Sequence, residues 1–176
     1  MDHFYPKSRY PFLAVSIENL IPVCPSCNYN KKEHEIGYSS YDKRYETDSL
    51  LQFGYYINDL NYLTEKSGIR ICVNAKNELF EKNIDFLALN SLYQIHADVV
   101  LECIKKGMIY SETYMDNMIA NYPELFDSKE EICRILFGSY LNQDDYAKRP
   151  LSKMTKDILG EIFETLYGIR LEELMK

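Results

Sequence analysis

The hydrophobic pattern divides the chain into three parts. Residues 1–36 show no sustained period and contain four prolines. After a polar, turn-rich stretch at residues 37–49, two runs rich in β-branched and aromatic residues, LLQFGYYIN and GIRICVN, predict a hairpin or small sheet. Residues 84–176 change to the spacing of amphipathic helices. The pattern therefore predicts the α+β class with a mostly α-helical C-terminal domain.

Local signals predict where elements begin and end. LIPVC is expected to form a short strand, and SCNYNKKEH a helix with Ser26 as its N-cap. DFLALNSLYQIHADVVLECIKKG is expected to be helical and to end at Gly107, as a C′ glycine would end it. Ser111 and Ser152 are expected to cap later helices, and Gly138 to end one.

Charge is distributed unevenly along the 176 residues, whose net charge is −7. This balance disfavours a general nucleic-acid binder, because neutralising phosphates needs clustered Lys and Arg. Residues 1–45 hold six basic and five acidic residues, whereas the remainder holds 14 and 22. Contact with nucleic acid is therefore expected at the N-terminal end, with help from another chain. Sixteen tyrosines offer stacking platforms for bases, although packing is their plainer interpretation.

The expected compartment is the cytoplasm. No apolar run reaches the roughly 18 residues that span a membrane, and the first residues lack a basic-then-apolar signal pattern. Five cysteines with one closely spaced pair do not read as a disulfide framework. Cys72, Cys103 and Cys133 are expected to be buried free thiols.

The first 31 residues contain the side chains that are candidates for catalysis or metal binding. They occur in DHFYP, in NL and in CPSCNYNK. In chain order they are Asp2, His3, Asn19, Cys24, Cys27, Asn28 and Lys31. Each has an ordinary explanation alone: a frayed chain end, an asparagine that shapes a turn, or a chance CxxC at a helix start. Their order and mutual spacing make the set specific.

This set resembles the HNH endonuclease family, the ββα-metal nucleases, over roughly the first 35 residues. The family pattern runs D-H-x-x-P, then N-L, then C-x-x-C-[HN]-x-x-K. By this resemblance residues 1–45 form the nuclease motif, and residues 46–176 form a small hairpin followed by a helical domain. The helical part, including YQIHADVVLECIKKGMIYSETY, resembles more loosely the HNH proteins partnered with an ATPase in Septu-type anti-phage systems.

The resemblance implies a set of roles in phosphodiester hydrolysis. His3 is the general base that takes a proton from water, and Asn19 holds its ring by a hydrogen bond. Asp2 and Asn28 bind one catalytic Mg²⁺ or Mn²⁺, since oxygen ligands suit hard cations. Asn28 stands where the family often has histidine, so the affinity is expected to be low. Lys31 approaches a phosphate of the DNA.

The resemblance also implies a structural zinc ion held by two CxxC pairs. Cys24 and Cys27 supply one pair, and the other lies upstream of the Asp-His element in the family. The chain is therefore expected to be an N-terminally truncated form that binds zinc poorly. His34 and Cys72 are weaker choices for a further ligand.

Two functions from different classes follow. The favoured hypothesis is a metal-dependent DNA endonuclease, the nuclease subunit of an ATPase-partnered anti-phage defence system. The alternative is a catalytically inert HNH-derived module whose helical domain docks a partner. A free-standing zinc-knuckle binder of nucleic acid is a third interpretation, which the acidic charge disfavours.

Overall fold

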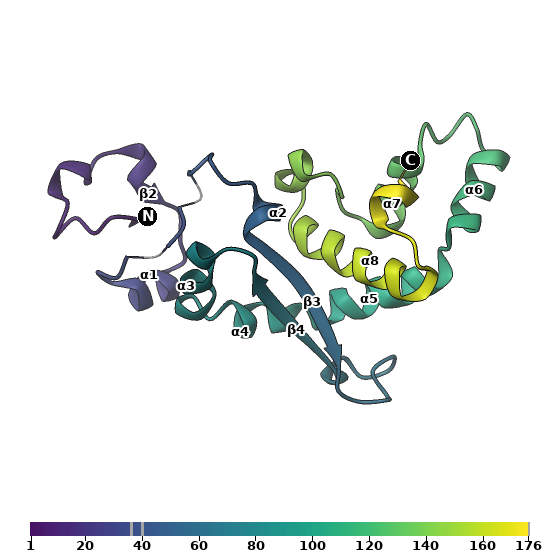
Figure 1. Cartoon of the computed structure of the whole chain (residues 1–176), viewed down its shortest axis with the longest axis horizontal. Coiled ribbons are helices and arrows are strands. Elements are labelled where there is room, and N and C mark those ends of the chain that lie inside the picture. The colour runs from purple at the N-terminus through teal and green to yellow at the C-terminus, as the bar shows by residue number, and fades with distance from the viewer. Residues whose placement is uncertain (36, 40, 176) are drawn as a thin grey trace. The chain divides into compact units, whose positions relative to one another are not determined.

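A computed structural model describes residues 1–35, 37–39 and 41–175 of the chain. Helices are combined with two separate two-stranded sheets, which confirms the expected α+β class (Figure 1). No helix within the described residues is long and apolar enough to cross a membrane.

The chain folds into two compact units. The first contains Met1–Leu51 and Val73–Leu92, and the second contains Gln52–Cys72 and Tyr93–Lys176. These units are defined by packing. The predicted boundary at residue 45 concerns the extent of the nuclease motif, and it stays a prediction.

The first unit begins with a strand, a strand and a helix. The two strands pair antiparallel, with Asp2 opposite Ile21 and His3 opposite Leu20. A loop with two 3-10 turns connects them, and a helix follows the second strand. The elements of this unit are β1 (Asp2–His3), β2 (Leu20–Ile21), α1 (Pro25–Lys31), α2 (Thr47–Leu50), α3 (Glu78–Phe86) and α4 (Leu89–Tyr93), the last residue of which belongs to the second unit.

The start of α1 differs from the expected one. Cys24 is the N-cap, and its Sγ accepts a hydrogen bond from the Cys27 N–H at 3.4 Å. Ser26 therefore lies inside the helix, and its predicted capping role is wrong. Pro25 gives the physical reason, because proline favours the first helical position, where its missing N–H costs nothing.

Asn83 on α3 ties the segment after α1 into the first unit. Its buried side-chain oxygen accepts hydrogen bonds from the N–H groups of Gly37 and Tyr38, at 2.8 and 3.2 Å. Its amide nitrogen donates to Tyr38 O at 3.1 Å. The rings of His34 and Phe86 add a contact with 5.4 Å between centroids. The segment that follows α1 is therefore held to α3 by polar and aromatic contacts.

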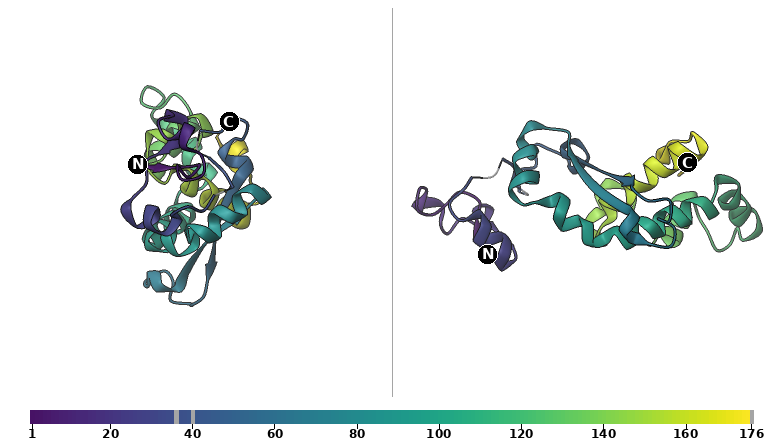
Figure 2. Two further views of the ribbon diagram at one scale, coloured as in Figure 1. Left: turned by 90° about the vertical axis from the view of Figure 1, so that its left-hand side faces the viewer. Right: turned by 90° about the horizontal axis from the view of Figure 1, so that it is seen from below.

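The two predicted strands are confirmed as β3 (Leu51–Ile57) and β4 (Ile69–Ala75), which pair with each other. Their antiparallel course is visible in Figure 2. Hydrogen bonds flank the two ends of the pairing, from Asn58 N to Gly68 O and from Lys76 N to Leu50 O, both at 2.8 Å. Phe53, Ile71 and Val73 are buried, as expected of strands with one covered face.

The second unit packs its helices around α5 and α8, which lie side by side (Figure 1). Its helices are α5 (Ala97–Ile109), α6 (Glu112–Asn121), α7 (Lys129–Phe137), α8 (Ser152–Tyr167) and α9 (Leu171–Leu174), with a 3-10 segment at Gln143–Lys148. The side chains at the centre of this core are fully buried. They include Val100, Met115, Ile132, Ile158, Leu159, Phe163 and Leu174.

Two predicted helix ends are confirmed. Ser111 caps α6, where its hydroxyl accepts from the Tyr114 N–H at 3.3 Å. Gly138 ends α7 with a φ of 69°, a left-handed conformation that glycine adopts without strain. Cys103 and Cys133 are buried free thiols, as expected, whereas Cys72 is half-buried.

Three other expectations are wrong. The long helix predicted before residue 107 is interrupted near Ala88, whose φ is 49°, and again by a 3-10 turn at Gln94–His96. Gly107 does not end α5, which continues to Ile109. A Cβ at Gly107 would lie 2.5 Å from Ile162 Cγ2, so this glycine instead allows α8 to approach closely.

Ser152 is the first residue of α8 rather than its cap. The N-cap is Leu151, in a left-handed conformation with a φ of 61°, and the Ser152 hydroxyl donates to Arg149 O at 2.9 Å. Pro150 and Leu151 form a turn directly before α8, and the capping pattern alone did not reveal it.

Candidate functional site

Lys31 connects the first strand of the chain to the first helix. Its Nζ lies 3.2 Å from Asp2 Oδ2 and donates a hydrogen bond to His3 O at 2.5 Å. The side chains of Lys31 and Asp2 are only 4% and 11% exposed. Buried charges are tolerated when they are paired and hydrogen-bonded, so this contact holds β1 against α1. Three of the predicted site residues are thereby brought together.

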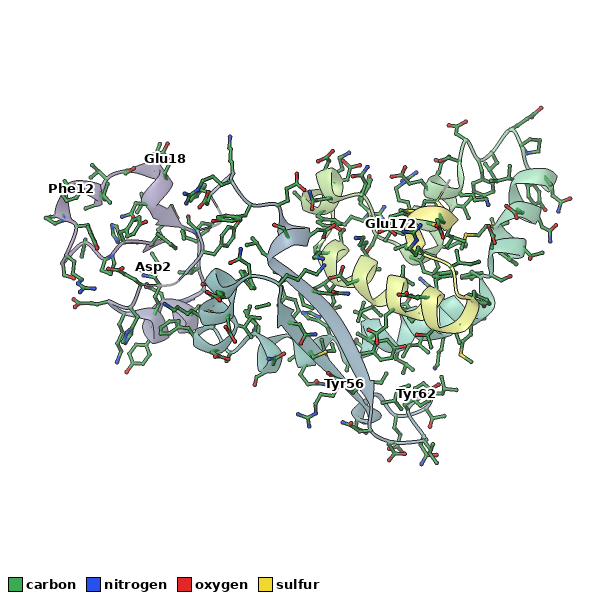
Figure 3. All side chains as sticks on the ribbon, viewed as in Figure 1. Asp2, Phe12, Glu18, Tyr56, Tyr62 and Glu172 are labelled. Atoms are coloured by element: carbon green, nitrogen blue, oxygen red, sulfur yellow. The ribbon has the colours of Figure 1, made fainter. Side chains whose placement is uncertain are left out.

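Each carboxylate oxygen of Asp2 already has one polar contact within the protein. Oδ2 faces Lys31, and Oδ1 accepts the His3 N–H at 2.7 Å. Each oxygen of a carboxylate has two lone pairs, so one on each is left for a further ligand. Figure 3 labels Asp2 on the side of the segment that faces α1, while Phe12 lies at the exposed tip of the loop between the strands.

The backbone orients the imidazole of His3. Its Nε2 lies 3.0 Å from Ala14 O, and a carbonyl oxygen can only accept, so Nε2 carries the proton in this contact. In the neutral ring the lone pair is then on Nδ1. The half-buried His3 therefore has a defined tautomer with Nδ1 as its basic nitrogen.

Asn19 is buried and shapes the loop that holds the ring. Its Oδ1 accepts the Tyr5 N–H at 2.7 Å, while its Nδ2 donates to Tyr5 O and Leu13 O, both at 3.1 Å. The expected hydrogen bond to the imidazole is not among these contacts, because both amide protons bond to the backbone and the Nε2 proton of His3 is donated to Ala14 O. Asn19 instead positions Leu13, whose neighbour Ala14 contacts His3. The spacing of side chains in the sequence could not predict that the backbone carbonyl of Ala14 would accept the hydrogen bond of the His3 ring.

Asn28 stands one helical turn before Lys31 and is exposed. Residues three apart lie on the same face of a helix, so Asn28 shares the α1 face that reaches β1. The amide oxygen of Asn28 and the carboxylate of Asp2 are both of the ligand type that suits Mg²⁺ or Mn²⁺, and their joint role as metal ligands stays a prediction. In this structure the ammonium of Lys31 supplies the positive charge beside Asp2, so an incoming cation must share or displace it.

The two cysteines of the CxxC lie together at the start of α1. The Cys27 N–H bonds the Cys24 thiol, and this contact is the main cause of the lowered pKa of exposed Cys24. The Cys27 pKa is raised, chiefly by the hydrogen bond of its thiol to Cys24. No group of three or more His, Cys, Asp or Glu side chains suited to a metal occurs in the described part of the chain. The proposed half zinc site stays a prediction.

Comparison with known proteins finds no matching family model, no significantly similar curated protein and no significantly similar solved structure. The assignment of function therefore depends on the residues of the site and their geometry.

Proposed function

We propose that the chain is a metal-dependent DNA endonuclease of the HNH type, which hydrolyses phosphodiester bonds. The observation that carries this proposal is the imidazole of His3, held at Nε2 by Ala14 O with Nδ1 as its basic nitrogen, directly after the carboxylate of Asp2. An antiparallel strand pair followed by a helix supports it, because this is the element order that a ββα-metal site requires.

Each residue of the site has a role in this proposal. His3 Nδ1 takes the proton of the attacking water, a contribution typically worth about 10²–10⁴ in rate. Asp2 and Asn28 supply oxygen ligands, and the bound Mg²⁺ or Mn²⁺ would neutralise charge on the phosphate and the leaving oxygen. Asn19 is a positioning residue that acts through the loop. Lys31 holds β1 in place, and the phosphate contact predicted for it is a second role in this proposal.

The biological setting is part of the proposal. The chain would act as the nuclease subunit of an anti-phage system, with an ATPase partner that grips DNA. Its uneven charge supports this setting, because residues 1–45 carry a net charge of about +1 and the remainder −8.

A plasmid-cleavage assay with Mg²⁺ or Mn²⁺ tests the activity. His3→Ala should lower the cleavage rate about 100-fold or more. His96→Ala is the matched control, because that half-buried histidine lies at the end of a 3-10 turn in the second unit, where its ring contacts Tyr93. Cleavage by His3→Ala at the wild-type rate would contradict the assignment of the base.

A second function, an inert binding or assembly module, is favoured by the occupied oxygens of Asp2. Lys31 and the His3 N–H already satisfy this carboxylate without a metal. Absence of any Mg²⁺- or Mn²⁺-dependent cleavage, with and without the ATPase partner, would support the inert module against the nuclease.

A further inference from the structure

A basic segment interrupts the acidic second unit. Residues 146–156 contain four Lys or Arg and no Asp or Glu. Three of these cations have acidic partners: Lys148 with Asp145 at 2.7 Å, Lys153 with Asp157 at 2.7 Å, and Lys156 with Glu172 at 3.6 Å. The fourth, Arg149, is exposed, and no carboxylate of the described residues lies within 4.0 Å of its guanidinium. Its positive charge is therefore available to a ligand.

Arg149 belongs to a cluster of cations around one aromatic ring. The ring of half-buried Tyr140 has Arg134, Lys148 and Arg149 at 5.8, 5.1 and 5.6 Å from its centroid. Arg134 is neutralised by Glu131 at 2.9 Å. The negative face of an aromatic ring attracts cations, so Tyr140 helps to hold the guanidinium of Arg149 in place. Lys148 is paired with Asp145, so Arg149 is the cation of this cluster whose charge remains for an anionic ligand.

A cavity of about 360 Å³ lies beside this cluster, and we name it the Arg149 cavity. Phe53 and Tyr93 form an aromatic wall, with their rings edge to face at 4.7 Å. The remaining lining residues include Tyr146, Arg149 and the first residues of α8. Its volume falls within the range of about 300–1,000 Å³ that is usual for small-molecule sites.

We propose that the Arg149 cavity binds a nucleotide unit. Half-buried Tyr93, with buried Phe53 packed against it, offers a surface for the base, because every base has a π-face that packs on aromatic side chains. The guanidinium of Arg149 offers two parallel donors for a phosphate. The first residues of the 16-residue helix α8 also line the cavity, and the first backbone N–H groups of a helix have no acceptor within the helix. The nucleotide is either free or an unpaired nucleotide of a nucleic-acid strand, since both present the same chemistry.

This site lies outside the region where net charge predicted contact with nucleic acid. The average charge of the C-terminal part does not reveal Arg149, because its charge depends on which of the neighbouring cations are paired with Asp145, Asp157 and Glu172 in the folded chain. The inference goes beyond the proposed nuclease, and it requires no cleavage, no metal and none of the residues of the first unit.

Binding measured in EDTA tests the proposal separately from nuclease activity. The full chain is titrated with AMP by calorimetry and with a short, fluorescently labelled oligo-dT by anisotropy, at low salt. Arg149→Gln should weaken binding about tenfold or more, as expected for loss of a charged hydrogen-bonding partner. Arg70→Gln is the matched control, because Arg70 is also exposed, lies on β4 within the second unit and changes the net charge equally. It should change affinity by less than about twofold.

The two ligands distinguish the sources of the nucleotide. Arg149-dependent binding of AMP identifies a site for a free nucleotide, and Arg149-dependent binding of the oligonucleotide alone identifies a site for a strand. Adenosine should compete with AMP only weakly, because it keeps the base but lacks the phosphate that Arg149 binds. The proposal is overturned if wild-type protein binds neither ligand, or if Arg149→Gln and Arg70→Gln, both with wild-type melting temperatures, bind equally well.

Discussion

Replacement of Lys31 by methionine should release the first strand without unfolding the rest of the protein. Methionine keeps most of the length of the buried side chain but removes its ammonium, which contacts Asp2 Oδ2 at 3.2 Å and His3 O at 2.5 Å. Breaking a buried ion pair by removing one partner usually costs about 3–5 kcal/mol. The Asp2 carboxylate keeps the hydrogen bond from the His3 N–H at 2.7 Å, however, so the loss of Lys31 does not leave it without a partner.

The expected loss is therefore closer to the value of the charged hydrogen bond itself. Hydrogen bonds to charged groups contribute about 1.5–3 kcal/mol. We expect the local free energy of opening of β1 to fall by about 2–3 kcal/mol, which corresponds to roughly 30- to 150-fold faster amide exchange. The reporter is the N–H of Phe4, which donates to Asn19 O at 2.8 Å and so monitors the pairing of β1 with β2.

Hydrogen exchange followed by NMR provides the measurement. Lys32→Met is the matched control, because Lys32 is adjacent but exposed, and its Nζ lies 5.1 Å from the ring of Tyr29. The N–H of Thr155 in α8 should exchange at the wild-type rate in both variants, since it lies in the other unit. Equal exchange of Phe4 in Lys31→Met, Lys32→Met and wild type would refute the role of the ion pair in anchoring β1.

Three further predictions concern packing, thiols and zinc. Gly107→Ala should lower the free energy of unfolding by about 1–3 kcal/mol through overpacking. At Gly160 an added Cβ meets no atom within 4 Å, so Gly160→Ala should raise the free energy of unfolding by up to about 1 kcal/mol. Denaturant titration measures both, and equal unfolding midpoints would contradict the close approach of α5 and α8. Cys24 has a lowered pKa and becomes a thiolate at lower pH than an ordinary cysteine, so iodoacetamide should modify it first as pH rises. Burial raises the pKa of Cys103 and Cys133 to about 12 and should protect them from modification. Mass spectrometry of the labelled peptides measures the order, and modification of Cys103 or Cys133 before Cys24 would contradict the prediction. The CxxC pair fills only half of a tetrahedral site, so the purified monomer should hold zinc weakly, and elemental analysis that finds one tightly bound zinc per chain would contradict this.

Local signals in the sequence were sufficient for the elements whose causes lie within a few residues. The runs that form β3 and β4 are rich in β-branched and aromatic residues, and the run of β4 also alternates between buried and more exposed positions, so both are recognisable without knowing what covers them. The cap at Ser111 and the left-handed Gly138 likewise depend on hydrogen bonds and dihedral angles inside one turn. The α+β class followed from the same local patterns.

The sequence also identified which side chains of the N-terminal segment could carry chemistry, but it could not predict their contacts. The pairing of Lys31 with Asp2 and the contact of His3 Nε2 with Ala14 O join residues far apart in the chain, and the latter uses a backbone atom that no side-chain motif specifies. Gly107 shows the same limit. Its place in the sequence predicted the end of a helix, but in the structure it allows the close approach of Ile162 from another helix. Composition and spacing are properties of the chain alone, so they determine the class of fold and the candidate residues. The partner of a buried charge, the tautomer of a histidine and the use of a glycine depend on which distant segments meet, and only the tertiary structure decides that.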